Sequence, residues 1–326
     1  MEQVRVGMIG CGGHARWHLH TLSRLKGVSV VALVDPDPAQ IAKCRAEIPS
    51  LADVPAYDYH PEMIAHGGLD AVEICTPHTL HCAQVQDAFA AGLHVLCEKP
   101  LSTTVADCEA VIRARDTSGK VGVLGYQRHF MSEFKIIREA VASGDFGKVQ
   151  YVAALQAQEW KRFTMGTWRQ VPELSGGGQL NDSGSHLLDV LLWCTGLKPA
   201  TVSAVTDARE TPVDINSSLS ITFEGGATGS VAVIGDAHGW HEEFTVWCDR
   251  ATFYLRDGHL AMVDADGVRT DVEPRDGRGT PDENFVAAIR GEAEVASPFE
   301  CGLDVIRLTE AAWRSAANGG APERVF

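Results

Sequence analysis

Short apolar runs alternate with longer amphipathic stretches over the first 125 residues. The runs 4–9 and 28–34 are rich in β-branched residues, which is typical of buried parallel strands. Strands are also expected at 71–75, 94–97 and 121–125, and helices at 37–47, 59–66, 80–91 and 104–118. Strands that alternate with helices of this length predict a parallel sheet covered by helices on both faces.

After residue 125 the pattern changes. A helix at 130–142, a long strand at 149–159 and a strongly apolar helix at 185–195 come first. Closely spaced strand-like runs with glycine-rich turns between them then predict a large, mainly antiparallel open sheet. These runs are 201–208, 217–223, 228–234, 243–248, 252–256, 259–264 and 268–272, and helices follow at 282–290 and 301–317.

A glycine-rich turn joins the first expected strand to the first helix. Gly10-Cys11-Gly12-Gly13-His14-Ala15 fits the dinucleotide fingerprint G-x-G-x-x-G/A, and Asp35 ends the second strand 20 residues after Ala15. Gly10 allows the tight turn, Gly12 lets a pyrophosphate approach the backbone, and the start of the helix favours an anion. The carboxylate of Asp35 can accept hydrogen bonds from both ribose hydroxyls and would repel a 2′-phosphate. We therefore expect NAD, with NADP disfavoured.

These patterns predict an α/β protein with two domains. Residues 1–125 form a Rossmann NAD-binding domain and residues 126–326 an α/β domain, with C-terminal helices able to pack back on the first. Ligands bind beyond the carboxyl ends of parallel strands. The groups that follow those ends are therefore expected to face one crevice, which we place between the domains: Gly10–His14, Asp35, Thr76–His78, Glu98–Pro100 and Tyr126–His129.

Two further signals carry candidate chemistry. Lys99 follows a core strand and precedes Pro100, where partial desolvation would let it exchange protons or polarise a carbonyl. A structural ion pair with Glu98 is the alternative. Asp182 and His186 are four residues apart at an expected helix start, so a helical first turn would place both on one face. Asp182 as a helix cap and His186 as an interior histidine remain open alternatives.

Composition narrows the possible partners. The net charge of −15 argues against nucleic acid and anionic membranes, and no apolar run approaches the ~20 residues of a membrane span. The first strand begins three residues after Met1, so we expect no signal peptide. The nine cysteines contain no C-x-x-C and are expected to be reduced thiols of a cytoplasmic protein.

Together the glycine turn, Asp35, Thr76-Pro77 with His81, Glu98-Lys99-Pro100 and the segment 176–189 resemble the Gfo/Idh/MocA family, the glucose–fructose oxidoreductase and inositol dehydrogenase group. The resemblance covers nearly the whole chain. It implies that Lys99, Asp182 and His186 are catalytic, with His186 as the acid/base. It also implies a second domain that binds substrate and whose open sheet forms dimers or tetramers. The cofactor contacts that follow from the fingerprint and this resemblance are Gly10, Gly12, Gly13, His14, Asp35, Thr76, His78, His81, Glu98, Lys99, Trp168 and Arg169.

The remaining candidates are weaker. His14 and His18 have metal-ligand spacing, but their helix supplies no accompanying carboxylate or cysteine, so we expect no metal site. Candidate substrate contacts are Gln127, Arg128, Trp160 and His238. Bases and aromatic residues in loops are more often solvated or at subunit contacts.

The sequence thus predicts an NAD-dependent dehydrogenase that oxidises a secondary alcohol of a polyol, inositol or sugar-like substrate. The expected partners are this small molecule and further copies of the chain. Two alternatives remain: an NAD-sensing regulatory or binding protein, and a redox-neutral NAD-dependent glycosidase.

Overall fold

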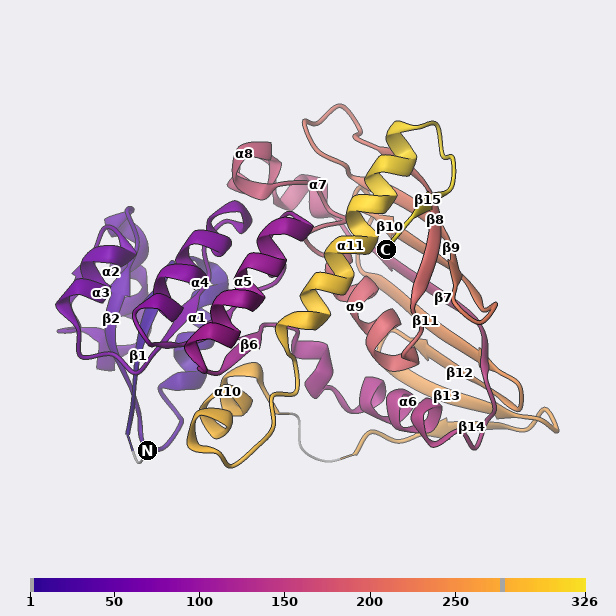
Figure 1. Ribbon diagram of the computed structural model, residues 1–326, viewed down its shortest axis with the longest axis horizontal. Coiled ribbons are helices and arrows are strands. Elements are labelled where there is room, and N and C mark those ends of the chain that lie inside the picture. Colours follow the sequence, from indigo (N-terminus) through magenta and orange to yellow (C-terminus); the bar gives the residue numbers. More distant parts are fainter. Residues whose placement is uncertain (1–2, 276–278) are drawn as a thin grey trace. The chain divides into compact units, whose positions relative to one another are not determined.

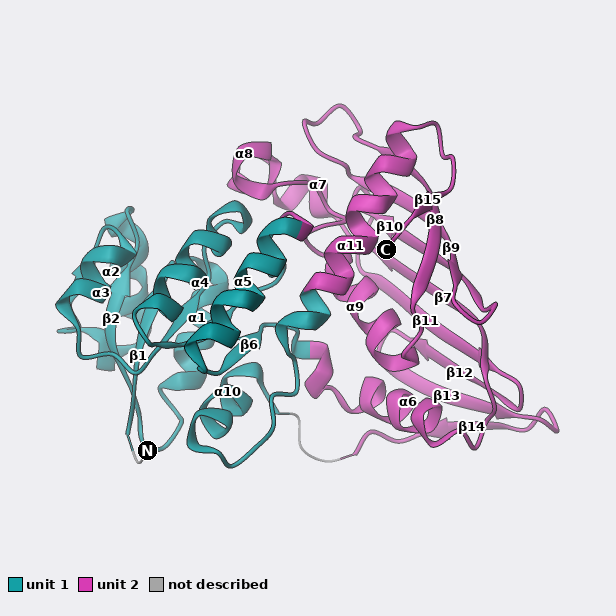
Figure 2. Ribbon diagram, in the orientation of Figure 1, with its two compact units in different colours: residues 1–102, 106–127, 279–302 teal, residues 103–105, 128–278, 303–326 magenta. Residues whose placement is uncertain are grey.

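The computed structural model describes residues 3–275 and 279–326, and the chain divides into two compact units (Figure 2). The first unit comprises residues 1–102, 106–127 and 279–302, and the second comprises 103–105, 128–278 and 303–326. The sequence predicted a boundary at residue 125, with C-terminal helices able to pack back on the first domain. The first unit extends to residue 127 and also contains the C-terminal segment 279–302.

The first unit (Figure 1) is built on a six-stranded parallel sheet. The strand order is β3-β2-β1-β4-β5-β6. This order and the helices between the strands confirm the predicted Rossmann architecture. The strands are β1 (Val4–Ile9), β2 (Val28–Val34), β3 (Ala56–Tyr57), β4 (Ala71–Ile74), β5 (His94–Cys97) and β6 (Gly122–Leu124). The sequence did not predict β3, because two residues are too few to show a periodic pattern.

Helices from both ends of the chain complete the first unit. Side chains of β1, α1, α2 and α10 share one buried core, in which Leu19 and Phe285 are almost fully buried. α10 begins with Pro281, and Thr280 caps it through a reciprocal capping box with Glu283. The helices are α1 (Gly13–Leu22), α2 (Pro38–Glu47), α3 (His60–His66), α4 (His81–Ala90), α5 (Val105–Ser118) and α10 (Pro281–Arg290).

The second unit contains a nine-stranded sheet with the order β14-β13-β12-β11-β7-β10-β9-β8-β15. β7 and β10 pair in parallel, and the other neighbours are antiparallel, as the sequence predicted for most of the sheet. The strands are β7 (Val149–Ala157), β8 (Pro199–Asp207), β9 (Asn216–Phe223), β10 (Thr228–Ile234), β11 (His241–Cys248), β12 (Ala251–Arg256), β13 (His259–Asp264), β14 (Arg269–Val272) and β15 (Glu323–Arg324). The short strand β15 was not predicted.

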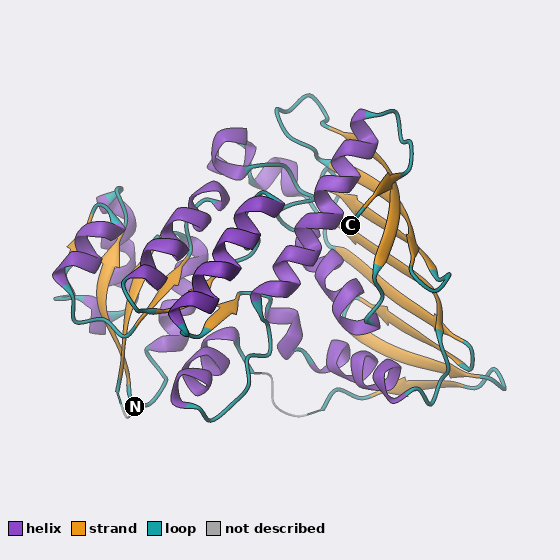
Figure 3. Ribbon diagram, viewed as in Figure 1, coloured by secondary structure: helices purple, strands orange, loops and turns teal. Residues whose placement is uncertain are grey.

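Helices lie on one face of this sheet (Figure 3). Along β9, buried Leu219, Ile221 and Phe223 alternate with exposed serine and threonine residues, as expected for a sheet with one covered and one open face. The helices are α6 (Ser132–Ser143), α7 (Trp160–Phe163), α8 (Pro172–Ser175), α9 (Gly184–Thr195) and α11 (Phe299–Ala317), whose residues from 303 onward belong to this unit.

Over residues 3–275 and 279–326, no helix combines the length and the apolar character that crossing a membrane requires. All nine cysteines are free thiols.

Candidate active site

The glycine turn between β1 and α1 has the form that a bound phosphate needs. Gly10 has a φ of +86°, and a Cβ there would lie 2.7 Å from the carbonyl oxygen of Cys75, so the turn requires glycine. Gly12 is the N-cap of α1 and provides no side-chain cap. A Cβ built on Gly12 meets nothing within 4 Å. The helix start is therefore open on this side, which fits the approach of a dinucleotide pyrophosphate.

Asp35, at the end of β2, is held against the same turn. Its Oδ2 accepts a hydrogen bond from the backbone N–H of Cys11 at 2.8 Å, and its Oδ1 accepts one from that of Asp37 at 2.9 Å. These two bonds fix the carboxylate beside the glycine turn. The placement fits the ribose contact that the fingerprint predicts.

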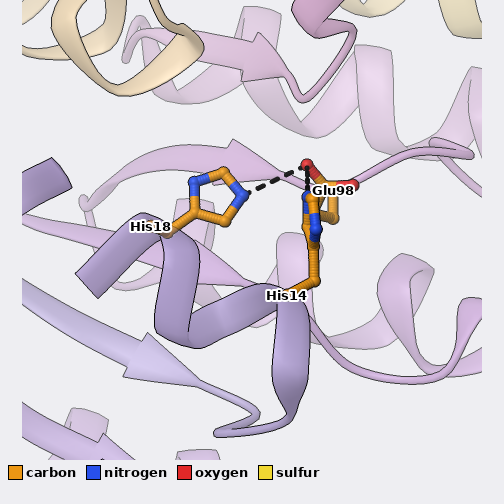
Figure 4. A group of neighbouring side chains, drawn as sticks. All are labelled: His14, His18 and Glu98. Atoms are coloured by element: carbon orange, nitrogen blue, oxygen red, sulfur yellow. Dashed lines mark hydrogen bonds and ion pairs between the residues drawn. The ribbon is translucent and has the colours of Figure 1, made fainter. Parts of the chain in front are cut away.

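Glu98 follows β5, and its carboxylate lies between His14 and His18 of α1, within ion-pair distance of both (Figure 4). Its Oε1 lies 3.2 Å from Nε2 of His14 and 3.2 Å from Nε2 of His18, and its Oε2 accepts the backbone N–H of Lys99 at 3.1 Å. Burial alone would raise the pKa of Glu98, but the charges and hydrogen bonds of His14 and His18 hold that pKa well below its usual range. Glu98 is therefore an ionised, buried acid.

His18, the second histidine beside Glu98, is fully buried and also lies close to the carboxylates of Asp282 and Glu73. Its Nδ1 lies 2.9 Å from Oδ1 of Asp282 and 3.7 Å from Oε2 of Glu73. Burial lowers the pKa of His18, but the charges and hydrogen bonds of Asp282, Glu98 and Glu73 outweigh it and raise that pKa well above its usual value. Burial raises the pKa of Glu73 well above the ordinary carboxyl range. Sequence reasoning missed Glu73 and Asp282, although a glutamate inside the apolar strand β4 was a usable signal.

A pocket of about 310 Å³ opens beside this group within the first unit. Its lining includes His14 from α1, Glu98 after β5 and Gln127 after β6. These three residues were expected to share one crevice, and they line one pocket within the first unit. Trp17 and Pro281 complete the lining.

Hydrogen bonds with Gln84 and His81 hold the loop after β4 in place. Thr76 donates its hydroxyl to Oε1 of Gln84 at 2.5 Å. His81 is fully buried, with Nδ1 2.8 Å from the carbonyl oxygen of Pro100 and Nε2 3.0 Å from that of Thr76. Both ring nitrogens thus face backbone oxygens, and His81 ties the loops after β4 and β5 together. His78 is also buried, with its ring 5.9 Å from that of His81.

In the second unit, Asp182 is buried and its carboxylate is fixed. Its Oδ2 accepts hydrogen bonds from Nε1 of Trp160 at 2.8 Å and from Nε of Arg169 at 2.9 Å. α9 begins at Gly184 and its N-cap is Ser183. Asp182 therefore lies before the helix: it is not the helix cap, and it does not belong to the helical face that its spacing from His186 predicted. His186 lies in the first turn of α9 and is partly buried.

The glycine run 176–178 is anchored by Asp214, a residue that sequence reasoning missed. The Asp214 carboxylate accepts the N–H of Gly178 at 3.0 Å, the N–H of Leu180 at 2.9 Å and Nε1–H of Trp313 at 3.2 Å. A Cβ on Gly178 would lie 1.9 Å from the backbone oxygen of Asp214. The close approach therefore requires glycine and fixes the loop that leads to Asp182.

Several residues that the sequence predicted as ligand contacts interact with other protein side chains in the structure. Trp160 and Arg169 bind Asp182, and the guanidinium of Arg169 lies 4.5 Å from the ring centre of Trp168. His238 is exposed in the loop between β10 and β11.

Two residues after β6 differ from expectation. Arg128 is buried in an ion pair with Glu242, and buried His129 lies 2.9 Å from Asp189 with its ring stacked on Trp193. This corrects the expectation that Arg128 and His129 face a ligand crevice, because the Arg128 guanidinium pairs with Glu242 and the His129 ring with Asp189 inside the second unit.

Comparison with known proteins agrees with this architecture. Residues 4–126 match the family model described as "Oxidoreductase family, NAD-binding Rossmann fold", and residues 134–254 match "GFO/IDH/MocA C-terminal domain". The rhizopine catabolism protein MocA of Rhizobium meliloti is 26% identical over 96% of this chain and 95% of its own length. An inositol 2-dehydrogenase of Leifsonia xyli is 32% identical, over 61% of this chain and 56% of its own length.

Solved structures share the fold over the whole chain. An aldose-aldose oxidoreductase from Caulobacter crescentus, solved with glycerol, has a TM-score of 0.86 at 23% identity and covers 99% of both chains. A levoglucosan dehydrogenase in complex with NADH and L-sorbose has a TM-score of 0.89 at 20% identity and covers 100% of both chains. With both family models matched in order along most of its length, the chain belongs to the Gfo/Idh/MocA family of NAD-binding oxidoreductases.

Proposed function

We propose that this protein is an NAD-dependent dehydrogenase that oxidises a secondary alcohol of a polyol, inositol or sugar-like substrate. The observation that carries the proposal is the buried carboxylate of Asp182, fixed by two donors ahead of His186 at the start of α9. A fixed carboxylate and a histidine in this segment are suited to moving the proton of a hydroxyl group. The name of one relative, inositol 2-dehydrogenase, supports a polyol as substrate.

The cofactor part of the proposal rests on the first unit. Gly10, Gly12, Gly13 and His14 surround the open start of α1, where free backbone N–H groups can hold a pyrophosphate, and Asp35 accepts the ribose hydroxyls. Asp35 also disfavours NADP, because its carboxylate would repel a 2′-phosphate. The further cofactor contacts that we propose are Thr76, His78, Glu98, Lys99, Trp168 and Arg169, while His81 acts by holding the two loops together.

Bound NAD supplies the acceptor for the hydride that leaves the alcohol carbon. His186 takes the hydroxyl proton as the C–H bond breaks, so that a carbonyl group forms. Asp182 stabilises the charged imidazole, and Trp160 and Arg169 keep its carboxylate in place. Lys99 holds the reacting oxygen and polarises it. Gln127, in the lining of the first-unit pocket, remains our candidate for binding a substrate hydroxyl.

The test is the absorbance of NADH formed from excess NAD over a panel of inositols, aldoses and sugar acids, with parallel runs in NADP. We expect turnover of one polyol class with NAD preferred. His186→Ala should lower kcat at least 100-fold, because general acid–base catalysis contributes on the order of 10²–10⁴. His20→Ala, a partly exposed histidine outside the proposed site, is the matched control and should retain activity.

Two outcomes contradict the proposal. Full activity of His186→Ala would remove this histidine from the reaction. Tight NAD binding without turnover of any compound would favour a cofactor-sensing protein or a redox-neutral enzyme.

We also propose that the protein forms a homo-oligomer through the open face of its nine-stranded sheet and acts in the cytoplasm. Tyr151, Trp247 and Tyr254 form an aromatic row across neighbouring strands, with ring centres 5.4 and 6.1 Å apart. Tyr151 is 37% exposed, so apolar surface is available for association. The nine free thiols suit a reducing compartment. Light scattering that shows a monomer at micromolar concentration would rule out the oligomer.

A further inference from the structure

We propose that His14, His18 and Glu98 form a binding site for a divalent transition metal ion, with Zn²⁺ as the best match. His14 and His18 are four residues apart on α1, the spacing with which two histidines of one helix can share a metal. The sequence offered no acid to accompany them. The structure supplies it from a different element, because Glu98 after β5 turns its Oε1 toward both rings (Figure 4).

The distances within this group suit tetrahedral coordination. Nε2 of His14 and Nε2 of His18 each lie 3.2 Å from Oε1 of Glu98, and the ligand atoms of all three residues lie within 4.8 Å of one another. Zinc bonds of about 2.0–2.1 Å in a tetrahedron place neighbouring ligand atoms roughly 3.3 Å apart. The two distances to Glu98 already have this value. The third distance, between the two histidine nitrogens, is within 4.8 Å and would shorten when the ion binds.

An outer carboxylate provides a second, independent observation. Nδ1 of His18 lies 2.9 Å from Oδ1 of Asp282, on the side of the ring away from Glu98. Histidines that bind metals commonly donate their other ring N–H to a carboxylate, which fixes the tautomer and orients the metal-binding nitrogen. Asp282 is fully buried and stands in this position toward His18.

The site has three protein ligands and an accessible side. The side chain of His14 is 48% exposed, and both His14 and Glu98 line the pocket of about 310 Å³. Three protein ligands with an open fourth position are typical of zinc sites that exchange a water or a small ligand. His14 and Glu98 also belong to the proposed NAD site. We therefore expect Zn²⁺ and the dinucleotide to exclude each other, and this last step rests on the proposed function.

The direct test is a Zn²⁺ titration of the metal-free full-length protein, without cofactor, against a chromophoric chelator. We expect one high-affinity ion per chain. His14→Ala should weaken its binding at least 10-fold and, because His14 is half exposed, should leave the fold intact. His20→Ala, on the same helix but outside the group, should bind Zn²⁺ like the wild type.

Binding that is equal in the wild type and in His14→Ala would overturn the proposal, because the ion would then be held by cysteines or other surface groups. Loss of binding in His20→Ala to the same degree would overturn it as well. The visible spectrum of bound Co²⁺ gives a second readout, and a spectrum without tetrahedral character contradicts the geometry. Asp282→Asn, with its fold checked by circular dichroism, should weaken binding about 10- to 100-fold.

A separate NADH titration, followed by cofactor fluorescence, tests the exclusion. Added Zn²⁺ should weaken NADH binding by the wild type and have much less effect on His14→Ala. Zn²⁺ binding with unchanged NADH affinity would support the metal site and contradict the shared placement of the cofactor. Failure of NADH to bind at all would contradict the proposed function while leaving the Zn²⁺ titration as an independent test.

Discussion

Gly12→Ala separates the binding role of the glycine turn from its folding role. The backbone at Gly12 has φ −69° and ψ −171°, a conformation that alanine adopts readily, and the added Cβ meets nothing within 4 Å. The free energy of unfolding should therefore stay constant or rise by about 0.4–1 kcal/mol, because alanine restricts the unfolded chain. A change in cofactor affinity then cannot be attributed to misfolding.

The expected loss is in dinucleotide affinity. The Cβ would project into the open space at the start of α1, where the proposed function places the pyrophosphate. Displacing one charge-assisted hydrogen bond costs roughly 1.5–3 kcal/mol, which corresponds to a Kd about 10- to 100-fold higher. Fluorescence titration with NADH gives this Kd, and thermal unfolding of the same sample gives the stability.

Gly10→Ala is the matched control with the opposite expectation. Gly10 has a φ of +86°, and its Cβ would lie 2.7 Å from a backbone oxygen, so this variant should lose roughly 1–3 kcal/mol of stability. If folded Gly12→Ala binds NADH within twofold of the wild type, the pyrophosphate does not lie against Gly12. The assignment of the turn would then be wrong.

Three other changes test separate parts of the structure. Trp160→Phe removes the 2.8 Å hydrogen bond to Asp182, so kcat should fall about 10- to 100-fold with little change in KM; steady-state kinetics that show an unchanged kcat would exclude a positioning role. Asp35→Ala should weaken NAD binding about 10-fold and reduce the preference for NAD over NADP, measured as the ratio of the Kd for NADP to the Kd for NAD. The hydrogen bond from Arg115 holds the pKa of Glu300 below its usual value. This pair therefore stabilises the folded protein fully at pH values above the pKa that Glu300 has in the unfolded chain, and the stabilisation is lost as the pH falls through the lower pKa of the folded state. Arg115→Ala should therefore cost about 0.5 kcal/mol at pH 7, after solvent screening of the half-exposed Glu300, and the gap to the wild type should narrow in urea unfolding as the pH is lowered through the acid range.

The sequence predicted the elements well where a periodic pattern was long enough to read. β1, β2 and β5 have the predicted bounds because each is an apolar run between clear turn signals. β3 and β15 were missed, since two-residue strands are defined by their neighbours in the sheet and carry no pattern of their own.

The site was predictable only as far as local motifs reach. Asp182 and His186 were selected from one short segment, and the structure shows what the segment does not: Asp182 is held by Trp160, 22 positions earlier in the chain. The carboxylates around His18 depend on contacts over much greater separations, 264 positions in the case of Asp282. Such pairs are set by the packing of α1 against α10, which no single-sequence pattern records.

The return of α10 to the first unit has a consequence for the order in which the protein is made. The last strand of the parallel sheet, β6, leaves the ribosome with Leu124, whereas Asp282 and Phe285 emerge more than a hundred residues later. Until then the nascent sheet lacks the aromatic side chain that completes its core and a carboxylate that contacts His18. Vectorial synthesis therefore makes β7 to β14 of the second sheet before the first unit can reach its final packing, and the growing chain carries an incomplete nucleotide fold over that whole stretch of translation.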